Sequence, residues 1–533
     1  MESNRLTGVG DTMKEFNTTG LCIPKKHYMV DISDKLEKNN ALIEKDKYFT
    51  INRSRQYGKT TTLNALCERL QDRYQVVWLS FEGMGDAAFE NDVAFMKNFV
   101  RKFAKELRFT KVTEEAKKRW SDVSDYKEEE YEDAFEYLGE KITKICQQSE
   151  KEILLFVDEV DKSVDNQVFL HFLGMLRNKY LFRESGRDYT FKSVILAGVY
   201  DIKNLKVKLR PKEERKYNSP WNIAVDFDVD MSFSPKEIAT MLKEYELDYH
   251  TGMDMKKICE EIYAYTSGYP YLVSCICKWI DEQGQKCWTT EGVKSAVKSI
   301  LKTRTTLLDD LIKNVENYSE IKEIVLDILY QGKEIVFHPA VPAIELGAVL
   351  GIWKEKNGCI AISNLIFERY LYDYSVGVKE LENKLLSPPR NQFIHDNHLN
   401  MELVLIKFQE LMQSEHRDSD EKFLERQGRL LFLCFLKPII NGTGFYYVEP
   451  ETRDSERMDI VVAYGAEEFI IELKIWRGME YRKKGIQQLE AYMDSRIAKK
   501  GYLVSFSFLK NKPYTSGWSE SEDTGKEIFE VTI

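Results

Sequence analysis

The sequence lacks several features that would each place a protein in a distinct class. No run approaches 18 consecutive apolar residues, so we expect no membrane-spanning helix and no membrane partner. The first residues lack the basic-then-apolar pattern of a secretory signal peptide. No two of the nine cysteines form a CxxC pair, which disfavours a zinc site and favours reduced thiols in a cytoplasmic protein.

Positive charge is also in short supply. The 77 lysines and arginines are outnumbered by 87 aspartates and glutamates, which gives a formal net charge of -10. This balance argues against a histone-like coat on nucleic acid but is compatible with a basic cleft on one domain. The chain has 533 residues, of which 43% are hydrophobic and 31% charged, so we expect two to four globular domains rather than one core.

Composition shifts divide the chain into successive regions. After a polar lead-in, the β-rich runs YFTINR, QVVWLSF, EILLFVDEV and FKSVILAGV alternate with helical stretches, which predicts an α/β domain with a parallel sheet. A charged stretch with apolar residues at helical spacing predicts an inserted helical hairpin between the second and third runs. The predicted regions are a lead-in at 1–45, the α/β domain at 46–233 with its helical insert at 97–150, a helical subdomain at 234–300, a winged-helix-like domain at 301–380, a linker at 381–400 and a second α/β domain at 401–533.

Local signals support the middle and C-terminal regions. Ser234 and Glu237 have the spacing of a capping box at the start of a helix. Helices followed by two short strands around Asn357 and Gly358 predict a winged-helix unit. The strands MDIVVAY, EFIIELKIW and GYLVSFSF, with a helix around 486–495, indicate the second α/β unit.

The run INRSRQYGKTTT carries the second half of a phosphate-binding P-loop between a strand and a helix. Gly58 lets the backbone approach phosphate, Lys59 can reach the terminal phosphates, and Thr60 can place its hydroxyl on Mg²⁺. Thr61 follows directly and is counted with the nucleotide site. Arg53 replaces the first glycine of the GxxxxGK[ST] pattern, so by pattern alone an ordinary strand–turn–helix with a lysine remains open.

A second run, EILLFVDEVDK, supports the nucleotide interpretation. It is an apolar strand that ends in Asp158 and Glu159, and buried carboxylates are unfavourable unless they meet a cation. Asp158 can hold Mg²⁺ through water, and Glu159 can orient or deprotonate an attacking water. Because the two runs rarely occur together by chance, they jointly predict a site for ATP and Mg²⁺.

Two N-terminal runs, FNTTGLCIPKKHYMVD and YFTINRSRQYGKTTTL, resemble the bacterial AAA-like ATPases whose loop reads R-x-R-Q-[FY]-GK-[ST]. In that family the first P-loop glycine is replaced, so Arg53 fits the family pattern. Gly268 and Pro270 resemble the G-x-P element of the related STAND P-loop NTPases, which implies that Pro270 lies near the base and sugar. The resemblance covers about residues 14–375 and implies nucleotide-gated rearrangement. A homo-oligomer formed through the ATPase domain is a further expectation.

The second α/β region places acidic and basic side chains on neighbouring strands. Glu472 and Lys474 are two residues apart on one predicted strand, so they project from the same face. A turn near 464–466 folds the strand that carries Asp459 beside it. Two adjacent carboxylates bind Mg²⁺ or Mn²⁺, which polarises a scissile phosphate, and a lysine can orient or activate water. By itself the pattern is weak, and a buried Glu472–Lys474 salt bridge without chemistry remains open.

The runs FLERQGRLLFLCFLKPIINGTGFYYVEP and GIQQLEAYMDS, with the ELKIWRG core, resemble the PD-(D/E)xK nuclease superfamily, in the type fused to AAA-like ATPases. The resemblance covers roughly residues 400–515 and implies a restriction-endonuclease-like α/β fold. It also implies that Glu425, on a preceding helix, joins the metal site and that Gln488, on the following helix, faces it.

Together these patterns predict an ATP-binding switch or ATPase that controls a metal-dependent nuclease, with DNA as the expected nucleic-acid partner. A role in defence against foreign DNA would rest on architecture alone. The alternative is a regulatory STAND-like ATP-binding protein whose C-terminal domain only binds nucleic acid or a partner. The intact set of Asp459, Glu472 and Lys474 favours the nuclease, because a domain kept for binding has no need of those three groups.

Overall fold

The structure is a computed structural model. It describes residues 13–533 except 110–111, 125, 128–132, 161–165, 200–220, 226, 228, 332–333, 383–391, 397, 416–424, 441–443, 448–459, 477, 497, 508–513 and 522–523. The chain forms two compact units. The first holds the chain up to Leu307 with His338–Lys354 and Ser363–Leu365, and the second holds Leu308–Phe337, Glu355–Ile362 and Ile366–Ile533.

The first unit is built on a four-stranded parallel sheet, counted over its described residues, with the strand order β1-β4-β3-β2. Its strands are β1 (Phe49–Asn52), β2 (Gln75–Ser80), β3 (Ile153–Asp158) and β4 (Ser193–Gly198). All four predicted β-rich runs are thereby confirmed as strands. Because neighbouring strands are parallel, β1 and β3 end at the same edge of the sheet, with β4 between them.

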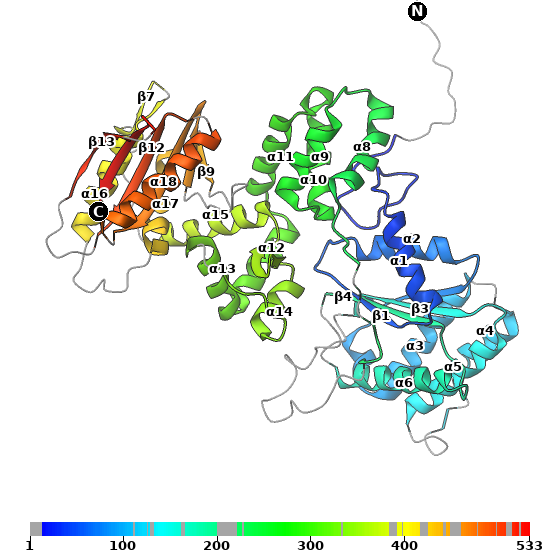
Figure 1. The fold of residues 1–533 in the computed structure, drawn as a ribbon. Coiled ribbons are helices and arrows are strands. Elements are labelled where there is room, and N and C mark those ends of the chain that lie inside the picture. The colour runs from blue at the N-terminus through cyan, green and yellow to red at the C-terminus, as the bar shows by residue number, and fades with distance from the viewer. Residues whose placement is uncertain are drawn as a thin grey trace, which may run out of the picture. The chain divides into compact units, whose positions relative to one another are not determined.

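Helices cover both faces of this sheet (Figure 1). The helices are α1 (Ser33–Glu44), α2 (Lys59–Leu70), α3 (Asp92–Leu107), α4 (Glu114–Ser121), α5 (Ala134–Gln148) and α6 (Gln167–Glu184), with a 3₁₀ turn η1 (Asp86–Phe89). Phe156 faces the core formed with α1 and α2, whereas Leu155 and Val157 face the core formed with α3, α5 and α6. Successive residues of β3 therefore supply two separate cores, as alternation along a buried strand requires.

The segment between β2 and β3 differs from the predicted helical hairpin at 97–150. It contains α3, α4 and α5, and α3 already begins at Asp92. The short helix α4 was hidden in the sequence by its charge, since its buried side chains are only Ala116 and Trp120. The Trp120 ring lies 4.2 Å from that of Phe103 between centroids, so this region belongs to the core on one face of the sheet.

An all-helical subdomain follows the sheet in the first unit, as the sequence predicts for 234–300. It comprises α8 (Pro235–Tyr249), α9 (Met255–Thr266), α10 (Pro270–Gln283), η4 (Gln285–Cys287) and α11 (Thr290–Lys302). The capping box at Ser234 is confirmed, because its side chain accepts from the Glu237 backbone while the Glu237 carboxylate accepts from the Ser234 backbone. Helix α8 therefore begins at the residue that the sequence marks.

The next region contains helices and a pair of short strands. They are α12 (Thr306–Asn317), α13 (Ser319–Gln331), α14 (Pro342–Val349), β5 (Trp353–Lys356), β6 (Cys359–Ile362) and α15 (Leu365–Glu382). β5 and β6 form a two-stranded sheet with Asn357 and Gly358 between them, both at positive φ. This is the local structure that an Asn-Gly pair favours. The winged-helix class of this region stays a prediction.

The second unit contains a six-stranded sheet, counted over its described residues, in the order β13-β14-β12-β11-β10-β9. Its elements are α16 (Met401–Glu415), α17 (Glu425–Ile440), β9 (Gly444–Tyr447), β10 (Ile460–Tyr464), β11 (Glu467–Ile475), α18 (Met479–Arg496), β12 (Lys500–Phe506), β13 (Ser516–Glu520) and β14 (Glu527–Thr532). β10 and β11 form an antiparallel hairpin, and β11 pairs with β12 in parallel. The predicted strands and helix of the second α/β region are confirmed at β10, β11, β12 and α18.

Part of the predicted linker at 381–400 is structured. Two short strands, β7 (Ile394–His395) and β8 (His398–Leu399), pair with each other, and Phe393 is fully buried with its ring 6.1 Å from that of Phe435. The aromatic side chain anchors this segment in the second unit, a tertiary contact that the paired prolines do not reveal. Within the part of the chain that the structure describes, no helix is long and apolar enough to cross a bilayer.

Candidate functional site

The turn between β1 and α2 has the backbone shape of a phosphate-binding loop. β1 ends at Asn52, and α2 begins at Lys59. Two residues of the turn have left-handed backbones, Gln56 at φ 57° and Gly58 at φ 82°. A Cβ on Gly58 would meet no atom within 4 Å, so glycine is needed there for its φ rather than for space. The turn leads into the amino end of α2, and the backbone N–H groups at the amino end of a helix favour an anion.

Thr60 and Asp158 meet at the edge of the sheet, although they are far apart in sequence. The Thr60 hydroxyl donates to Oδ2 of Asp158 at 2.8 Å. Asp158 is buried, with 3% exposure, at the end of β3. A hydroxyl and a carboxylate in contact form a set of hard oxygen donors, which fits Mg²⁺.

Glu159 follows Asp158 in a strained conformation. Its backbone φ is 56°, a left-handed value that is uncommon for a residue with a side chain. Its backbone N–H donates to Oδ1 of Asp158 at 3.0 Å, which fixes the carboxylate that Thr60 also contacts. Strain of this kind tends to occur at functional sites, and here it lies where the sequence predicts the hydrolytic base.

Lys59 is held inside the loop. Its Nζ donates to the carbonyl oxygens of Arg53 at 2.8 Å and Ser54 at 3.1 Å, and the residue is only 7% exposed. Arg53, which occupies the place of the first P-loop glycine, anchors the loop instead of loosening it. Its guanidinium donates to the carbonyl oxygens of Asn52 and Val229, both at 2.8 Å. A contact with the distant residue Val229 therefore helps to fix the shape of this loop, which lacks the first glycine of the general pattern.

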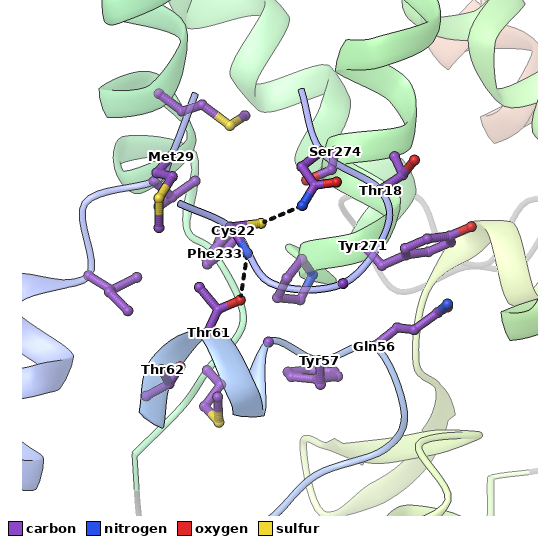
Figure 2. A pocket seen from close by; sticks show the side chains of 18 of the residues that line it. Thr18, Cys22, Met29, Gln56, Tyr57, Thr61, Thr62, Phe233, Tyr271 and Ser274 are labelled. Carbon is purple, nitrogen blue, oxygen red and sulfur yellow. Dashed lines mark hydrogen bonds between the residues drawn. The ribbon is translucent and has the colours of Figure 1, made fainter. Parts of the chain in front are cut away.

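A cavity of about 590 Å³ lies beside the loop within the first unit. Three of the residues predicted to hold nucleotide, Gly58, Thr61 and Pro270, line it. Figure 2 shows Thr61 on α2 directed toward Cys22, whose backbone N–H donates to the Thr61 hydroxyl at 3.4 Å. A helix amino end, a lysine and an adjoining apolar cavity are the parts that a phosphorylated nucleoside requires.

The N-terminal segment, for which the sequence predicts only a polar lead-in, forms one wall of this cavity. The lining includes Asn17, Thr18, Thr19, Gly20 and Cys22. These residues lie in the FNTTGLCIPKKHYMVD run, which carries the family resemblance but contains no recognised nucleotide-binding motif. The resemblance was the signal that could have placed them at the site.

Asn39 on α1 also lines the cavity. It is 1% exposed, and neither amide atom of its side chain has a hydrogen-bond partner among the described residues. A buried amide without a partner is unfavourable by about 1–3 kcal/mol. Asn39 therefore places a buried amide without a partner among the described residues in the lining of the cavity.

In the second unit, the structure brings Glu472 and Lys474 together on β11. Lys474 Nζ lies 2.8 Å from Oε1 of Glu472. The Glu472 side chain is 1% exposed and that of Lys474 is 26% exposed, so the pair bridges the interior and the surface. The shared face of the two residues is as predicted from their spacing.

Two other predicted members of this site, Asp459 and the side chain of Glu425, lie outside the described part of the chain. Asp459 lies outside the described residues, although Ile460, which follows it in sequence, pairs with Ile471. Glu425 is the first residue of α17, and its side chain lies outside the described part. Among the described residues, no three metal-ligating side chains gather at one point.

Gln488 lies on α18, which packs against β11. A Cβ on Gly485, three residues before Gln488, would lie 3.2 Å from Cγ of Lys474. Residues three apart share a helix face, so the face of α18 that carries Gln488 covers β11 beside Lys474. The structure thus collects Glu472, Lys474 and this helix face in one region.

Comparisons with known proteins give several solved structures and one family profile that are similar to this chain. A Walker-type ATPase of Pyrococcus abyssi matches with 13% identity and a TM-score of 0.40, covering 67% of this chain and 99% of that one. Cdc6p from Pyrobaculum aerophilum matches with 14% identity and a TM-score of 0.31 (64% and 94% covered), and the Aeropyrum pernix ORC2 protein with 12% and 0.38 (66% and 97%). No curated protein matches. The sequence profile of the AAA-like domain matches residues 22–373, more than half of the chain, and the chain therefore belongs to the AAA-like domain family.

Proposed function

We propose that this protein is an ATP-dependent switch whose nucleotide state governs a metal-dependent nuclease in its C-terminal domain. The observation that carries the nucleotide half is the 2.8 Å contact between the Thr60 hydroxyl and the Asp158 carboxylate. Residues separated by almost a hundred positions meet there, at the amino end of the helix that follows the loop. Membership of the AAA-like family is consistent with ATP as the ligand.

The chain's own residues divide the work at the nucleotide site. The N–H groups at the start of α2 receive the phosphates, and Lys59 transfers its hydrogen bonds from loop carbonyls to phosphate oxygens. Thr60 and Asp158 would hold Mg²⁺, which would neutralise charge on the terminal phosphates. Glu159 orients the attacking water. The cavity lined by Thr61 and Pro270 takes the base and ribose.

The nuclease half is supported by the position of Glu472 and Lys474. A carboxylate with 1% exposure and an amine sit on one face of an interior strand, with α18 packed over it. Together with Asp459, Glu472 would hold Mg²⁺ or Mn²⁺, with Glu425 joining them and Gln488 facing the site. The metal supplies Lewis-acid polarisation of a phosphodiester when bound. Lys474 would then orient the attacking water, and DNA is the expected substrate.

A second candidate function is favoured by the same pair. The Lys474 ammonium lies 2.8 Å from Oε1 of Glu472 and offsets the charge of that carboxylate without a metal. In that case the C-terminal domain binds nucleic acid or a protein, and the chain is a regulatory ATP-binding switch without nuclease activity. The two candidates differ in whether a divalent cation binds beside Glu472.

The nucleotide site is tested with Lys59→Ala. The substitution removes the ammonium that the loop holds, and ATP binding measured by calorimetry should weaken by about 1.5–3 kcal/mol, the range for a hydrogen bond to a charged group. Lys38→Ala, an exposed lysine on α1, is the matched control and should leave affinity unchanged. Unchanged affinity in Lys59→Ala refutes the P-loop assignment.

The nuclease is tested by incubating the full chain with single- and double-stranded DNA and RNA, with Mg²⁺ or Mn²⁺, with and without ATP. The proposal expects cleavage that requires the metal and changes with ATP. Glu472→Gln keeps the side-chain shape and should abolish cleavage, whereas Lys483→Met, an exposed lysine on α18, should not. Metal-dependent binding or cleavage that survives Glu472→Gln excludes this site, and binding without cleavage in the parent supports the regulatory candidate.

A further inference from the structure

Tyr269 lies between the helical subdomain and the phosphate-binding loop. It directly precedes α10 and is the middle residue of the Gly268–Pro270 sequence element. Its hydroxyl donates to the carbonyl oxygen of Arg55 at 2.5 Å and lies 3.1 Å from the hydroxyl of Ser54. Its ring meets that of Tyr57 edge-on, with centroids 4.6 Å apart. A side chain that is 3% exposed is thus directed at three residues of the loop.

The backbone around Tyr269 is fixed by contacts that do not involve the loop. Gly268 has φ 74°, and its carbonyl accepts from the Phe233 N–H at 2.8 Å. A Cβ on Gly268 would fall 2.1 Å from the Phe233 carbonyl oxygen, so only glycine fits. Pro270 occupies the first turn of α10, where its ring fixes φ. Tyr269 is therefore presented to the loop from a rigid corner.

The loop, by contrast, depends on such outside contacts for its shape. Gln56 and Gly58 have positive φ, so this stretch belongs to neither β1 nor α2. In a planar trans peptide the C=O and N–H point in opposite directions. Anchoring the Arg55 carbonyl on Tyr269 therefore turns the Gln56 N–H of the same peptide away from Tyr269. Gln56 lines the cavity beside the loop.

We propose that Tyr269 is a positioning residue whose hydroxyl holds the phosphate-binding loop in the shape that receives the terminal phosphates. The proposal rests on the nucleotide site proposed above. The ring of Tyr269 serves packing, whereas the hydroxyl acts on the loop. Because Tyr269 is attached to α10, a displacement of the helical subdomain would release Ser54 and Arg55. Tyr269 thereby connects the position of that subdomain to phosphate binding.

The test is Tyr269→Phe, which removes the hydroxyl and keeps the ring against Tyr57. Affinities for ATP, ADP and adenosine are measured by calorimetry on the full chain. ATP binding should weaken about tenfold, the effect of one lost neutral hydrogen bond. Adenosine has no phosphate, so its affinity should change by less than about twofold. If Tyr269 served only general stability, Tyr269→Phe would lower the affinities for all three ligands alike.

Tyr245→Phe is the matched control. Tyr245 is a buried tyrosine of the same subdomain, and its hydroxyl donates to Asp281 at 2.5 Å, not to the loop. Its ATP affinity should equal that of the parent. In Ser54→Ala, part of the effect should already be present, and adding Tyr269→Phe should then weaken ATP binding by less than the sum of the single effects.

The outcomes separate this proposal from the site on which it rests. Equal loss of ATP and adenosine in Tyr269→Phe overturns the positioning role, as does unchanged ATP affinity. If Lys59→Ala abolishes ATP binding while Tyr269→Phe retains it fully, the nucleotide site stands and the role of Tyr269 is wrong. If the parent binds no ATP, the nucleotide site is refuted and the proposal with it.

Discussion

The ion pair on β11 makes an asymmetric prediction about stability. Lys474→Met removes a charged partner of a carboxylate that is 1% exposed, whereas Glu472→Gln leaves a lysine that is already 26% exposed. Breaking a buried pair leaves an uncompensated charge and is unfavourable by about 3–5 kcal/mol. The partial exposure of Lys474 places the expected loss at the lower end, about 3 kcal/mol. For Glu472→Gln we expect about 1 kcal/mol, because the ammonium can turn to water.

The assay is scanning calorimetry of the full chain, in which the unfolding transition of the domain that contains β11 is compared between the variants and the parent. A loss of about 3 kcal/mol corresponds to a melting temperature lower by roughly 6–12 °C. The double variant Lys474→Met with Glu472→Gln should recover most of that loss, since no unpaired charge remains. Lys483→Met, on the exposed side of α18, should shift the transition little. Lys474→Met behaving like Lys483→Met would refute the reasoning.

The same variant distinguishes the two candidate functions. If Glu472 belongs to a metal site, Mn²⁺ binds the native protein and should restore part of the stability lost in Lys474→Met, by the linkage between binding and folding. If the pair is purely structural, Mn²⁺ should have no effect. Two adjacent carboxylates repel each other without a metal, so the removal of one could by itself stabilise the fold. The contact with Lys474 argues against that outcome for Glu472.

Three other perturbations follow from the first unit. Glu159→Gln should retain ATP binding but stop hydrolysis, because the base acts after the nucleotide is held; turnover at the parent rate in a phosphate-release assay places the base elsewhere. Gly268→Ala should destabilise the protein in urea by about 2–4 kcal/mol, since its Cβ collides with Phe233. Gly252 has a similar positive φ, but a Cβ there would meet no atom within 4 Å, so Gly252→Ala should lower the free energy of unfolding by only about 1 kcal/mol. Equal losses in the two variants would show that the contact with Phe233 is not the cause. Asn39→Leu should raise the stability of the nucleotide-free protein by about 1 kcal/mol, because an amide without a partner is removed; a lower melting temperature would show that the amide has one.

Much of the fold could be predicted because it depends on local patterns. The four strands of the first sheet are short apolar runs between charged helices, and the capping box at Ser234 marks the start of α8. The meeting of Thr60 and Asp158 was also predictable, since parallel strands end at one edge of the sheet. The strands and the helix start are each encoded in a short stretch of sequence, and the Thr60–Asp158 contact follows from two such stretches and the parallel order of the strands.

The remaining features depend on contacts between distant residues. Arg53 reaches a carbonyl 176 positions away, and the hydroxyl of Tyr269 lies beside that of Ser54, 215 positions away. No periodicity or motif spacing records such a partner. The wall formed by Asn17–Gly20 and Cys22 was overlooked for the same reason, because small residues in a lead-in have no local signature of the cavity they line.

Arg53 shows that a motif can keep its geometry while losing its best-known residue. A search that demands glycine at the first P-loop position passes over this chain, although the turn it encodes is present. Replacing Arg53 with glycine to match the general pattern would remove two hydrogen bonds, to Asn52 and Val229, and leave a more pliable turn. In this chain the turn is therefore held by the Arg53 guanidinium together with the backbone carbonyls of Asn52 and Val229 that accept its hydrogen bonds.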